Sequence, residues 1–306
     1  NQWITEPAIM FAYNPDHVWE RYGEFNENPA VSYVEGPWLF KNGDDYYLTY
    51  AAPGTSLSTY AMGTYVSQSP LGPYTYQSRN PILRKTSGLV RGPGHGSIVR
   101  GPNETVWVFY TCTRCYNHIF ERRIGFDAAG FDDDGNLFAT ATEVPQFAPG
   151  EHAHPEQGND AGLLPVNLNK LASNSSSAPG RECSYAIDGS MRTWWQAAND
   201  DAEPWLSVDS RGLFRVSAVR LVWAEPNLDY RAGIIPGPYR YRVETKVDAG
   251  DAWDIAVDKS DNDVDMLIDY VTFVPRPAAF MRLVVVGWPD GLGVGVVDFT
   301  VFGKGE

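Results

Sequence analysis

The sequence has 306 residues, enough for two domains of ordinary size. Its formal charge of -14, with 38 Asp and Glu against 24 scattered Lys and Arg, argues against a nucleic-acid partner, because phosphate binding needs clustered cations. No run approaches the roughly 20 apolar residues of a membrane-spanning helix. Aromatic residues make up 13% of the chain, including 10 Trp and 17 Tyr, which favours a neutral ligand with flat faces, such as a sugar.

The first 140 or so residues are predicted to form short strands separated by turns. Asp45–Tyr50 and Thr105–Tyr110 are two alike aromatic strands, each introduced by a turn that contains glycine and asparagine. Each follows a motif with a glycine-proline pair, Glu35–Trp38 for the first strand and Gly92–Ser97 for the second. This repeat of about 60 residues predicts the four-stranded blades of a β-propeller.

The length before the first linker allows only two to three blades, whereas a propeller needs at least four to close. The chain also opens with Asn1 rather than with methionine or a signal peptide. We therefore expect a processed or truncated piece, with the remaining blades ahead of Asn1.

Residues 1–145 are predicted as the propeller part, 146–167 as a linker and 168–306 as a second all-β domain. The linker is rich in proline and glycine. It contains His152 and His154, which either bind a metal or lie in a solvated polar loop.

The second domain shows about eight short strand-like segments, several of which alternate apolar and polar residues as half-buried strands do. This pattern predicts a jelly-roll β-sandwich. The clearest segments are Ala186–Gly189, Trp205–Asp209, Val216–Trp223, Tyr239–Glu244, Met281–Val286 and Val296–Val301.

Three cysteines, Cys112, Cys115 and Cys183, are too few for a disulfide framework. Cys112, Cys115 and His118 offer three of the four ligands of a zinc site. A local disulfide or two packed thiols explain the pair more simply.

Three positions in the first domain have local settings that favour chemistry. Glu35 lies at a strand start between aromatic residues, where it is either a general acid or an acceptor for turn amides. His95 lies among glycines that allow close backbone approach, so it either contacts a ligand or caps neighbouring carbonyls. Arg122 and Arg123 point to opposite sides if extended, so one can face a site.

The order of the motifs over residues 15–138 resembles glycoside hydrolase family 43. The motifs that carry the resemblance are Trp19-Glu20, Val34–Trp38, Tyr46–Tyr50, Ser69–Tyr74, Asn80–Leu83, Gly92–Ser97, Trp107–Tyr110 and Arg123–Asp127. The resemblance implies part of a five-bladed propeller in a secreted or cell-surface glycosidase. Such an enzyme inverts the anomeric centre and is exo-acting on plant polysaccharide, as an α-L-arabinofuranosidase or a β-xylosidase.

The resemblance also assigns roles. Glu35 is the general acid, Arg123 or Arg122 lines the sugar subsite with Trp38, and His95 faces the propeller axis, where a calcium ion often lies with waters. No organic cofactor is expected. The catalytic base, an Asp of the first blade, has no matching motif in this chain. The alternative is therefore a non-catalytic carbohydrate-binding protein with a degenerate propeller.

The second domain, over about residues 168–304, resembles the discoidin or coagulation factor 5/8 type C family, which overlaps carbohydrate-binding modules of family 32. The motifs that carry the resemblance are Ala186–Gly189, Thr193–Trp195, Pro204–Asp209 and Val297–Gly303. It implies polysaccharide or oligosaccharide as the partner. It also implies a structural calcium held by Asp188, Thr193 and Asp298, oxygen donors that suit this ion. A plain turn and a plain strand end are the alternative.

Overall fold

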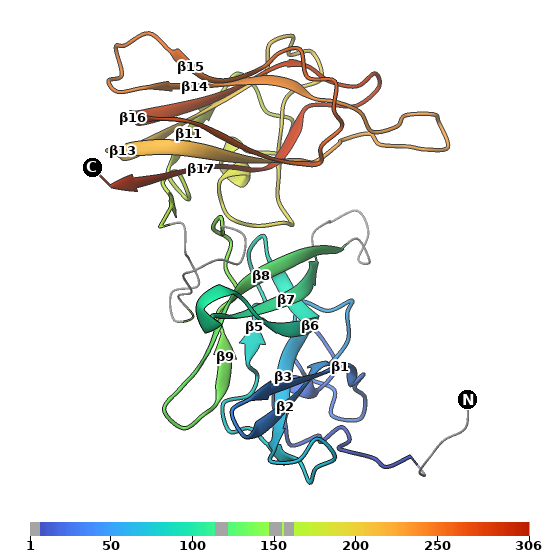
Figure 1. The fold of residues 1–306 in the computed structure, drawn as a ribbon. Helices are drawn as coiled ribbons and strands as arrows, with labels where there is room; N and C mark the ends of the chain where they lie inside the picture. The colour runs from blue at the N-terminus through green and yellow to red at the C-terminus, as the bar shows by residue number, and fades with distance from the viewer. Residues whose placement is uncertain (1–6, 114–121, 147–154, 156–161, 306) are drawn as a thin grey trace. The chain divides into compact units, whose positions relative to one another are not determined.

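The computed structural model describes residues 7–113, 122–146, 155 and 162–305. The chain divides into two compact units, residues 1–161 and 162–306. Each unit is built from strands, and the helical segments of the described residues are three short 3-10 turns, Val18–Glu20, Pro102–Glu104 and Cys183–Ala186 (Figure 1). None of the described residues form a helix that is long and apolar enough to cross a membrane.

The N-terminal unit contains two consecutive antiparallel sheets. The first sheet has the order β1-β2-β3-β4, with β5 paired to β3, and the second has the order β6-β7-β8-β9. The strands are β1 (Glu35–Asn42), β2 (Asp45–Ala52), β3 (Ala61–Ser67), β4 (Thr75–Tyr76), β5 (Leu83–Arg84), β6 (Arg91–Arg100), β7 (Val106–Thr113), β8 (Arg122–Phe131) and β9 (Leu137–Ala139).

The two sheets share one hydrophobic core. Tyr47 and Met62 from the first sheet lie in the same buried cluster as Ile98, Val108 and Tyr110 from the second. Because alternate residues of a strand point to opposite faces, each aromatic strand puts one set of side chains into this core. The arrangement fits two neighbouring blades of a propeller.

The opposite face of the first sheet is also covered. Trp19, in the segment before β1, packs with Tyr50 and Tyr65 in a second buried cluster, and its indole nitrogen donates to the Tyr76 hydroxyl at 2.8 Å. The segment before β1 therefore covers part of this face of the sheet.

The C-terminal unit is an eight-stranded sandwich. Its strand order is β10-β17-β13-β16-β14-β15, with β11 paired to β13 and β12 to β17. The strands are β10 (Leu164–Pro165), β11 (Leu171–Asn174), β12 (Trp195–Gln196), β13 (Trp205–Trp223), β14 (Arg240–Lys246), β15 (Asp254–Lys259), β16 (Ile268–Gly287) and β17 (Gly295–Gly305).

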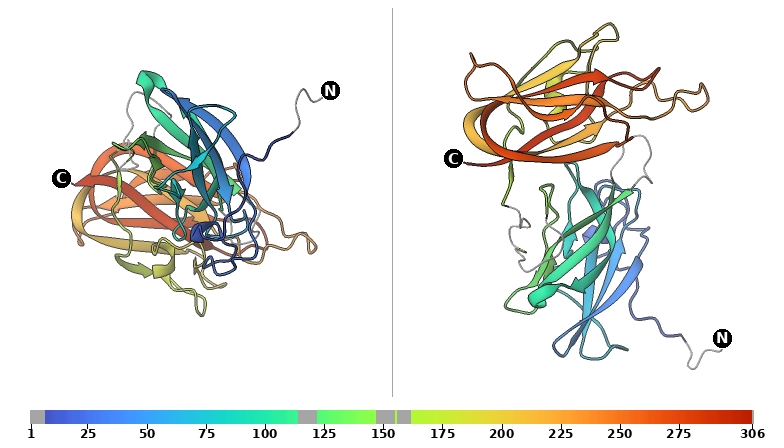
Figure 2. Two further views of the ribbon diagram at one scale, coloured as in Figure 1. Left: turned by 90° about the horizontal axis from the view of Figure 1, so that it is seen from below. Right: turned by 45° about the horizontal axis from the view of Figure 1, so that its top comes forward.

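Two long strands join the layers of this sandwich. Strands β13 and β16 pair along most of their length, but the register shifts between Asp209 and Phe214, where both strands bend. Figure 2 shows them curving from one layer into the other around the shared core. The predicted strands Trp205–Asp209 and Val216–Trp223 are therefore two halves of β13.

The fold class predicted from the sequence is confirmed: both units are all-β, the first fitting part of a propeller and the second a jelly roll. One predicted strand is wrong. Residues 186–189 end a 3-10 turn and continue into a tight turn, with Gly189 at φ +71°. Several residues of the predicted linker belong to the C-terminal unit, which begins at Gly162 and includes β10.

Candidate functional site

Glu35 is the first residue of β1 and is half-buried. Its Oε1 accepts a hydrogen bond of 2.8 Å from the hydroxyl of Tyr60, which lies just before β3. Burial, followed by the hydrogen bond to Glu35, raises the pKa of Tyr60, so this hydroxyl keeps its proton and remains a donor. Among the described residues, Oε2 of Glu35 has no hydrogen-bond partner.

The glycines of β6 make room for Tyr60. A Cβ atom at Gly94 would clash with the Tyr60 ring, and one at Gly96 would clash with the carbonyl of Phe109 and the sulfur of Met62. Close backbone approach, predicted from the glycine-rich sequence, is thus confirmed, and its partner at Gly94 is the tyrosine that holds Glu35.

His95 contacts the residue that follows Glu35 in the chain. Its side chain is exposed, and its ring packs on Gly36, where an added Cβ would lie 3.0 Å from the His95 Cγ. Both residues have positive φ, +49° for His95 and +63° for Gly36. The start of β1 and the middle of β6 therefore meet here, although 60 positions separate Glu35 from His95 in the sequence.

An open groove of about 630 Å³ begins beside this pair. Trp38, His95, Ser97, Phe109 and Ile124 are among its lining residues. Trp38 is 42% exposed, and its indole nitrogen donates to the Ile98 carbonyl at 2.9 Å, which fixes the ring on the groove wall. The groove thus joins an exposed aromatic face to an imidazole, side-chain types that bind sugars, and it includes Gly36, the residue after Glu35.

Arg122 is committed to protein acceptors. Its Nη atoms donate to the carbonyls of Thr55, Gly92 and Thr111 at 2.7–2.9 Å and to the Thr113 hydroxyl, and its Nε donates to the Thr111 hydroxyl. These bonds use all five N–H groups of a guanidinium. Burial lowers the pKa of Arg122, and its guanidinium carbon lies 5.4 Å from the centre of the Tyr60 ring. Arg122 therefore positions Tyr60, and its assignment to a sugar subsite gains no support from these contacts.

Arg123 is not among the residues that line the groove, so its predicted contact with the substrate stays a prediction. It is exposed, and its Nη1 donates to the Arg122 carbonyl at 3.1 Å. Cys112 is buried on the neighbouring strand with its sulfur 3.5 Å from the Arg123 carbonyl. The other predicted zinc ligands, Cys115 and His118, lie outside the described residues, as do His152 and His154.

The residues predicted to hold a structural calcium have other partners. Asp188 accepts the Thr193 hydroxyl at 2.6 Å and the Ser190 amide at 2.8 Å. Asp298 is buried and forms an ion pair of 2.7 Å with Arg220. Because that guanidinium already compensates the carboxylate, the contacts of Asp298 do not fit a cation.

No group of three or more His, Cys, Asp and Glu side chains comes close enough to hold a metal in the part of the chain that the structure describes. His95 contributes only a nitrogen donor at the groove, whereas calcium prefers several oxygen ligands. The described residues therefore do not by themselves form the calcium site expected at His95.

The C-terminal unit has a small pocket of about 200 Å³ among the loops that follow β12, β13 and β16. Asn199, Asp201, Asn227 and Trp288 contribute to its wall. Exposed polar groups beside an aromatic ring at a loop end are typical of sugar-binding sites in β-sandwiches. Trp288 was one of several tryptophans that the sequence left unassigned.

The sequence did not indicate Tyr60 as part of the N-terminal site, nor the structural role of Arg122. Tyr60 stands in a loop where nothing in the local pattern separates it from the other 16 tyrosines. The structural use of Arg122 was equally hidden, because its acceptors come from three separate segments.

Comparison with known proteins accounts for both units. Residues 10–137 match the family described as Glycosyl hydrolases family 43, and residues 170–297 match the F5/8 type C domain. The N-terminal unit is therefore similar to family 43 glycosyl hydrolases, and the C-terminal unit is similar to F5/8 type C domains.

One curated relative is the beta-D-galactofuranosidase of Aspergillus niger, with 26% identity over 88 residues. The match covers 29% of this chain and 26% of that protein. Among solved structures, a chitosan-binding module from the chitosanase/glucanase of Paenibacillus sp. IK-5 is similar, with 27% identity and a TM-score of 0.39 over 46% of this chain and 99% of the module. A protein described as a glycoside hydrolase has 20% identity and a TM-score of 0.43, over 90% of this chain and 61% of that one.

Proposed function

We propose that the N-terminal unit is the acid-bearing part of a glycosidase active site, with Glu35 as the general acid. The observation that carries this proposal is the setting of the Glu35 carboxyl group. One oxygen is fixed by Tyr60, the other has no hydrogen-bond partner among the described residues, and the next residue, Gly36, lines the groove with Trp38 and His95.

These contacts fit the step that an acid must perform. Oε2 gives its proton to the oxygen of the leaving sugar as the glycosidic bond breaks. The Tyr60 hydroxyl donates to Oε1 at 2.8 Å and stabilises the carboxylate that remains. Arg122 keeps the Tyr60 ring in place, so it acts as a positioning residue.

Inversion also requires a carboxylate base that activates water, about 6.5–9.5 Å from the acid. Asp44 follows the far end of β1, roughly 23 Å from Glu35 at the rise of an extended strand. It therefore cannot be the base. We propose that the base comes from propeller blades outside these 306 residues.

The proposed substrates are non-reducing ends of plant or microbial polysaccharides. The family resemblance favours α-L-arabinofuranosides and β-xylosides, and the name of the Aspergillus niger relative adds β-D-galactofuranosides. The proposed role of the C-terminal unit is to hold the enzyme on polysaccharide through the loop pocket with Trp288. Secretion is part of the same proposal, because such polymers lie outside the cell.

The activity test uses the protein as its gene encodes it, with any sequence ahead of Asn1 included. Nitrophenyl α-L-arabinofuranoside, β-D-xyloside and β-D-galactofuranoside are the probes. We expect hydrolysis of at least one, with the inverted anomer formed first in a proton NMR time course, and a loss of about a hundredfold or more in kcat for Glu35→Gln.

Glu104→Gln is the matched control, because Glu104 is exposed and lies in the turn before β7. It should hydrolyse at the wild-type rate. An unchanged rate in Glu35→Gln would remove Glu35 from the mechanism. Polysaccharide binding without hydrolysis of any probe would favour the non-catalytic carbohydrate-binding alternative.

A further inference from the structure

The sandwich of the C-terminal unit is open along one seam. Strand β15 is one edge of the sheet. Strand β14 pairs with β16 only over Phe280–Gly287, so the first half of β16 pairs with β13 on one side and leaves its other side as a second free edge of the sheet. Two contacts bridge these edges. Lys259 forms an ion pair of 2.6 Å with Asp269, and Arg276 donates a hydrogen bond of 3.0 Å to the Ile255 carbonyl.

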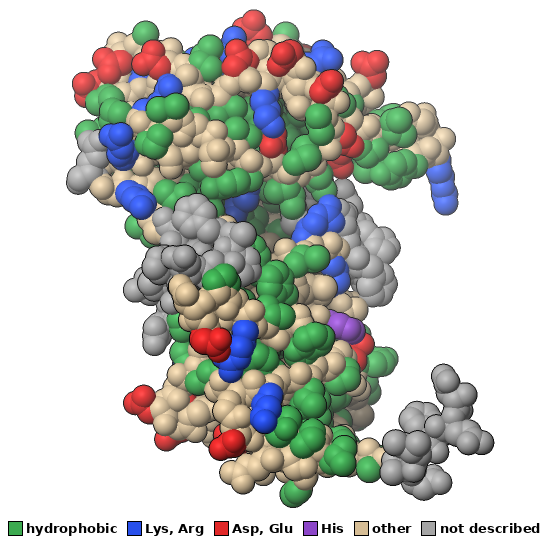
Figure 3. All heavy atoms as spheres, viewed as in Figure 1, with side chains coloured by type: hydrophobic (Ala, Val, Ile, Leu, Met, Phe, Trp, Pro, Cys, Tyr) green, Lys and Arg blue, Asp and Glu red, His purple; other side chains and the backbone are tan. Residues whose placement is uncertain are grey.

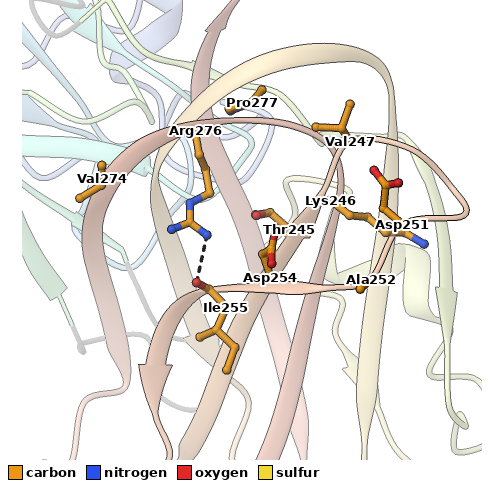
Figure 4. Close-up of a pocket in the computed structure, with 10 residues that line it drawn as sticks. All are labelled: Thr245, Lys246, Val247, Asp251, Ala252, Asp254, Ile255, Val274, Arg276 and Pro277. Atoms are coloured by element: carbon orange, nitrogen blue, oxygen red, sulfur yellow. Dashed lines mark hydrogen bonds between the residues drawn. The ribbon is translucent and has the colours of Figure 1, made fainter.

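A pocket of about 670 Å³ lies at the Arg276 end of this seam. Its volume is in the usual range for small-molecule sites. Figure 4 shows Arg276 from β16 directed toward the carbonyl of Ile255 in β15, with Thr245 from β14 and Asp254 from β15 to one side of it. The pocket thus lies between two strand edges rather than on a flat surface.

Opposite charges face this pocket without neutralising each other. Arg276 and Lys246 supply two cations, and Asp251 and Asp254 supply two carboxylates. Among the described residues, neither Arg276 nor Asp254 has an ion-pair partner, and the only hydrogen bond of the Arg276 side chain is to Ile255. Figure 3 shows Asp and Glu side chains, with Lys and Arg among them, over the part of this unit that carries β14 and β15.

We propose that this seam pocket binds a neutral sugar unit. A simple anion would satisfy Arg276 but leave Asp254 without a partner, and a simple cation would do the reverse. A sugar hydroxyl accepts from a guanidinium and donates to a carboxylate at once, so neighbouring hydroxyls bridge the two residues. Val274 and Ile255, two exposed apolar residues, are also among the residues that line the pocket.

The seam pocket is distinct from the loop pocket with Trp288. Strand β14 pairs Arg240 with Gly287 at one end and Lys246 with Phe280 at the other. The loop after Gly287 belongs to the loop pocket with Trp288, whereas the loop after Lys246 borders the seam pocket. The unit therefore has two sugar sites at opposite ends of the same strands, so one domain can contact two glycan chains or two places on one chain.

The test is a methyl NMR titration of the full chain. The probes are methyl β-D-galactopyranoside, methyl β-D-xylopyranoside and methyl α-L-arabinofuranoside, with glucuronic acid and glucosamine as charged counterparts. Methyl groups of Ile255, Val247 and Val274 report on the seam pocket, and those of Leu292 report on the loop pocket. We expect at least one neutral glycoside to shift the seam methyls, and to bind more tightly there than either charged sugar.

Arg276→Gln keeps a donor for the Ile255 carbonyl, and Asp254→Asn keeps the shape of the side chain. Each should weaken binding at the seam about tenfold or more. Arg192→Gln, which removes an exposed arginine elsewhere in the unit, should leave it unchanged. Chemical-shift changes confined to the Leu292 methyl groups would overturn the proposed seam site while leaving the proposed function intact. Tighter binding of a charged sugar, or unaltered affinity in both variants, would overturn it as well.

Discussion

At the scale of single residues, the buried carboxyl group of Asp127 in the N-terminal unit accepts several hydrogen bonds and is also desolvated. Asp127 on β8 is fully buried and accepts from the Tyr110 hydroxyl at 2.7 Å, from Thr142 at 2.5 Å and from Gln146 at 2.8 Å. These bonds fix the segment after β9 against the second sheet. Burial nevertheless raises the pKa of Asp127 to about 6, because the hydrogen bonds offset only part of the desolvation.

Asp127 predicts a pH dependence of stability. Its pKa rises from 3.8 in the unfolded chain to about 6 in the folded one, so between these values the folded state binds more protons. The free energy of unfolding should therefore fall as pH rises through this window, by about 3 kcal/mol at most. Denaturant unfolding at several pH values measures the slope.

Asp127→Asn should flatten this part of the slope, since the amide does not titrate. Asp133→Asn makes the same change at an exposed position in the turn after β8 and should keep the wild-type slope. A wild-type free energy of unfolding that increases over the same window would contradict the assignment.

At the scale of elements, the site depends on how closely strand β6 approaches its neighbours. Gly94→Ala places a methyl group in the Tyr60 ring and should destabilise the unit by about 1–3 kcal/mol. It should also lower kcat, because Tyr60 can no longer donate to Glu35 with the same geometry. Chemical unfolding and the glycoside assay measure the two effects.

Gly305→Ala is the control, since a Cβ at that position meets nothing within 4 Å. It should change neither quantity. A Gly94→Ala variant with wild-type stability would show that Tyr60 is not held by the β6 backbone.

Strands were the elements that the sequence predicted best. Alternating and aromatic segments such as Asp45–Tyr50 became β2, because pattern and propensity agree there. Contacts between distant segments were not predictable in this way. The pairing of Arg220 with Asp298 depends on the register between β13 and β17, which places Arg220 opposite Thr300. The calcium expected at Asp298 rested on the family resemblance and could not anticipate that arginine.

In the candidate site, too, local sequence patterns were informative, whereas contacts between distant segments were not predictable. Local sequence left Glu35 and His95 with two interpretations each, and only the order of motifs over 120 residues favoured one. Their contact through Gly36 arises from the stacking of two sheets, which no short window of sequence contains. Tyr60 was missed for the same reason.

At the scale of the whole molecule, each unit has its own hydrophobic core. The C-terminal core consists entirely of residues from 166 to 301, and β10 pairs with β17 to join the two ends of the unit. Residues 162–306 are therefore expected to fold when expressed alone. Dispersed methyl NMR signals that overlay on those of the full chain would confirm this, whereas a collapsed spectrum would show that the unit needs the rest of the chain.

The central claim is that Glu35 donates a proton to the leaving group, and leaving-group dependence tests it most directly. In the encoded protein, Glu35→Gln should lose about a hundredfold or more in kcat on an arabinofuranosyl or galactofuranosyl oligosaccharide, whose sugar leaving group needs the proton. It should lose far less on the matching dinitrophenyl glycoside, whose leaving group departs without one. An equal loss on both substrates would contradict the claim, because it would mean that Glu35 supports the site without acting as its acid.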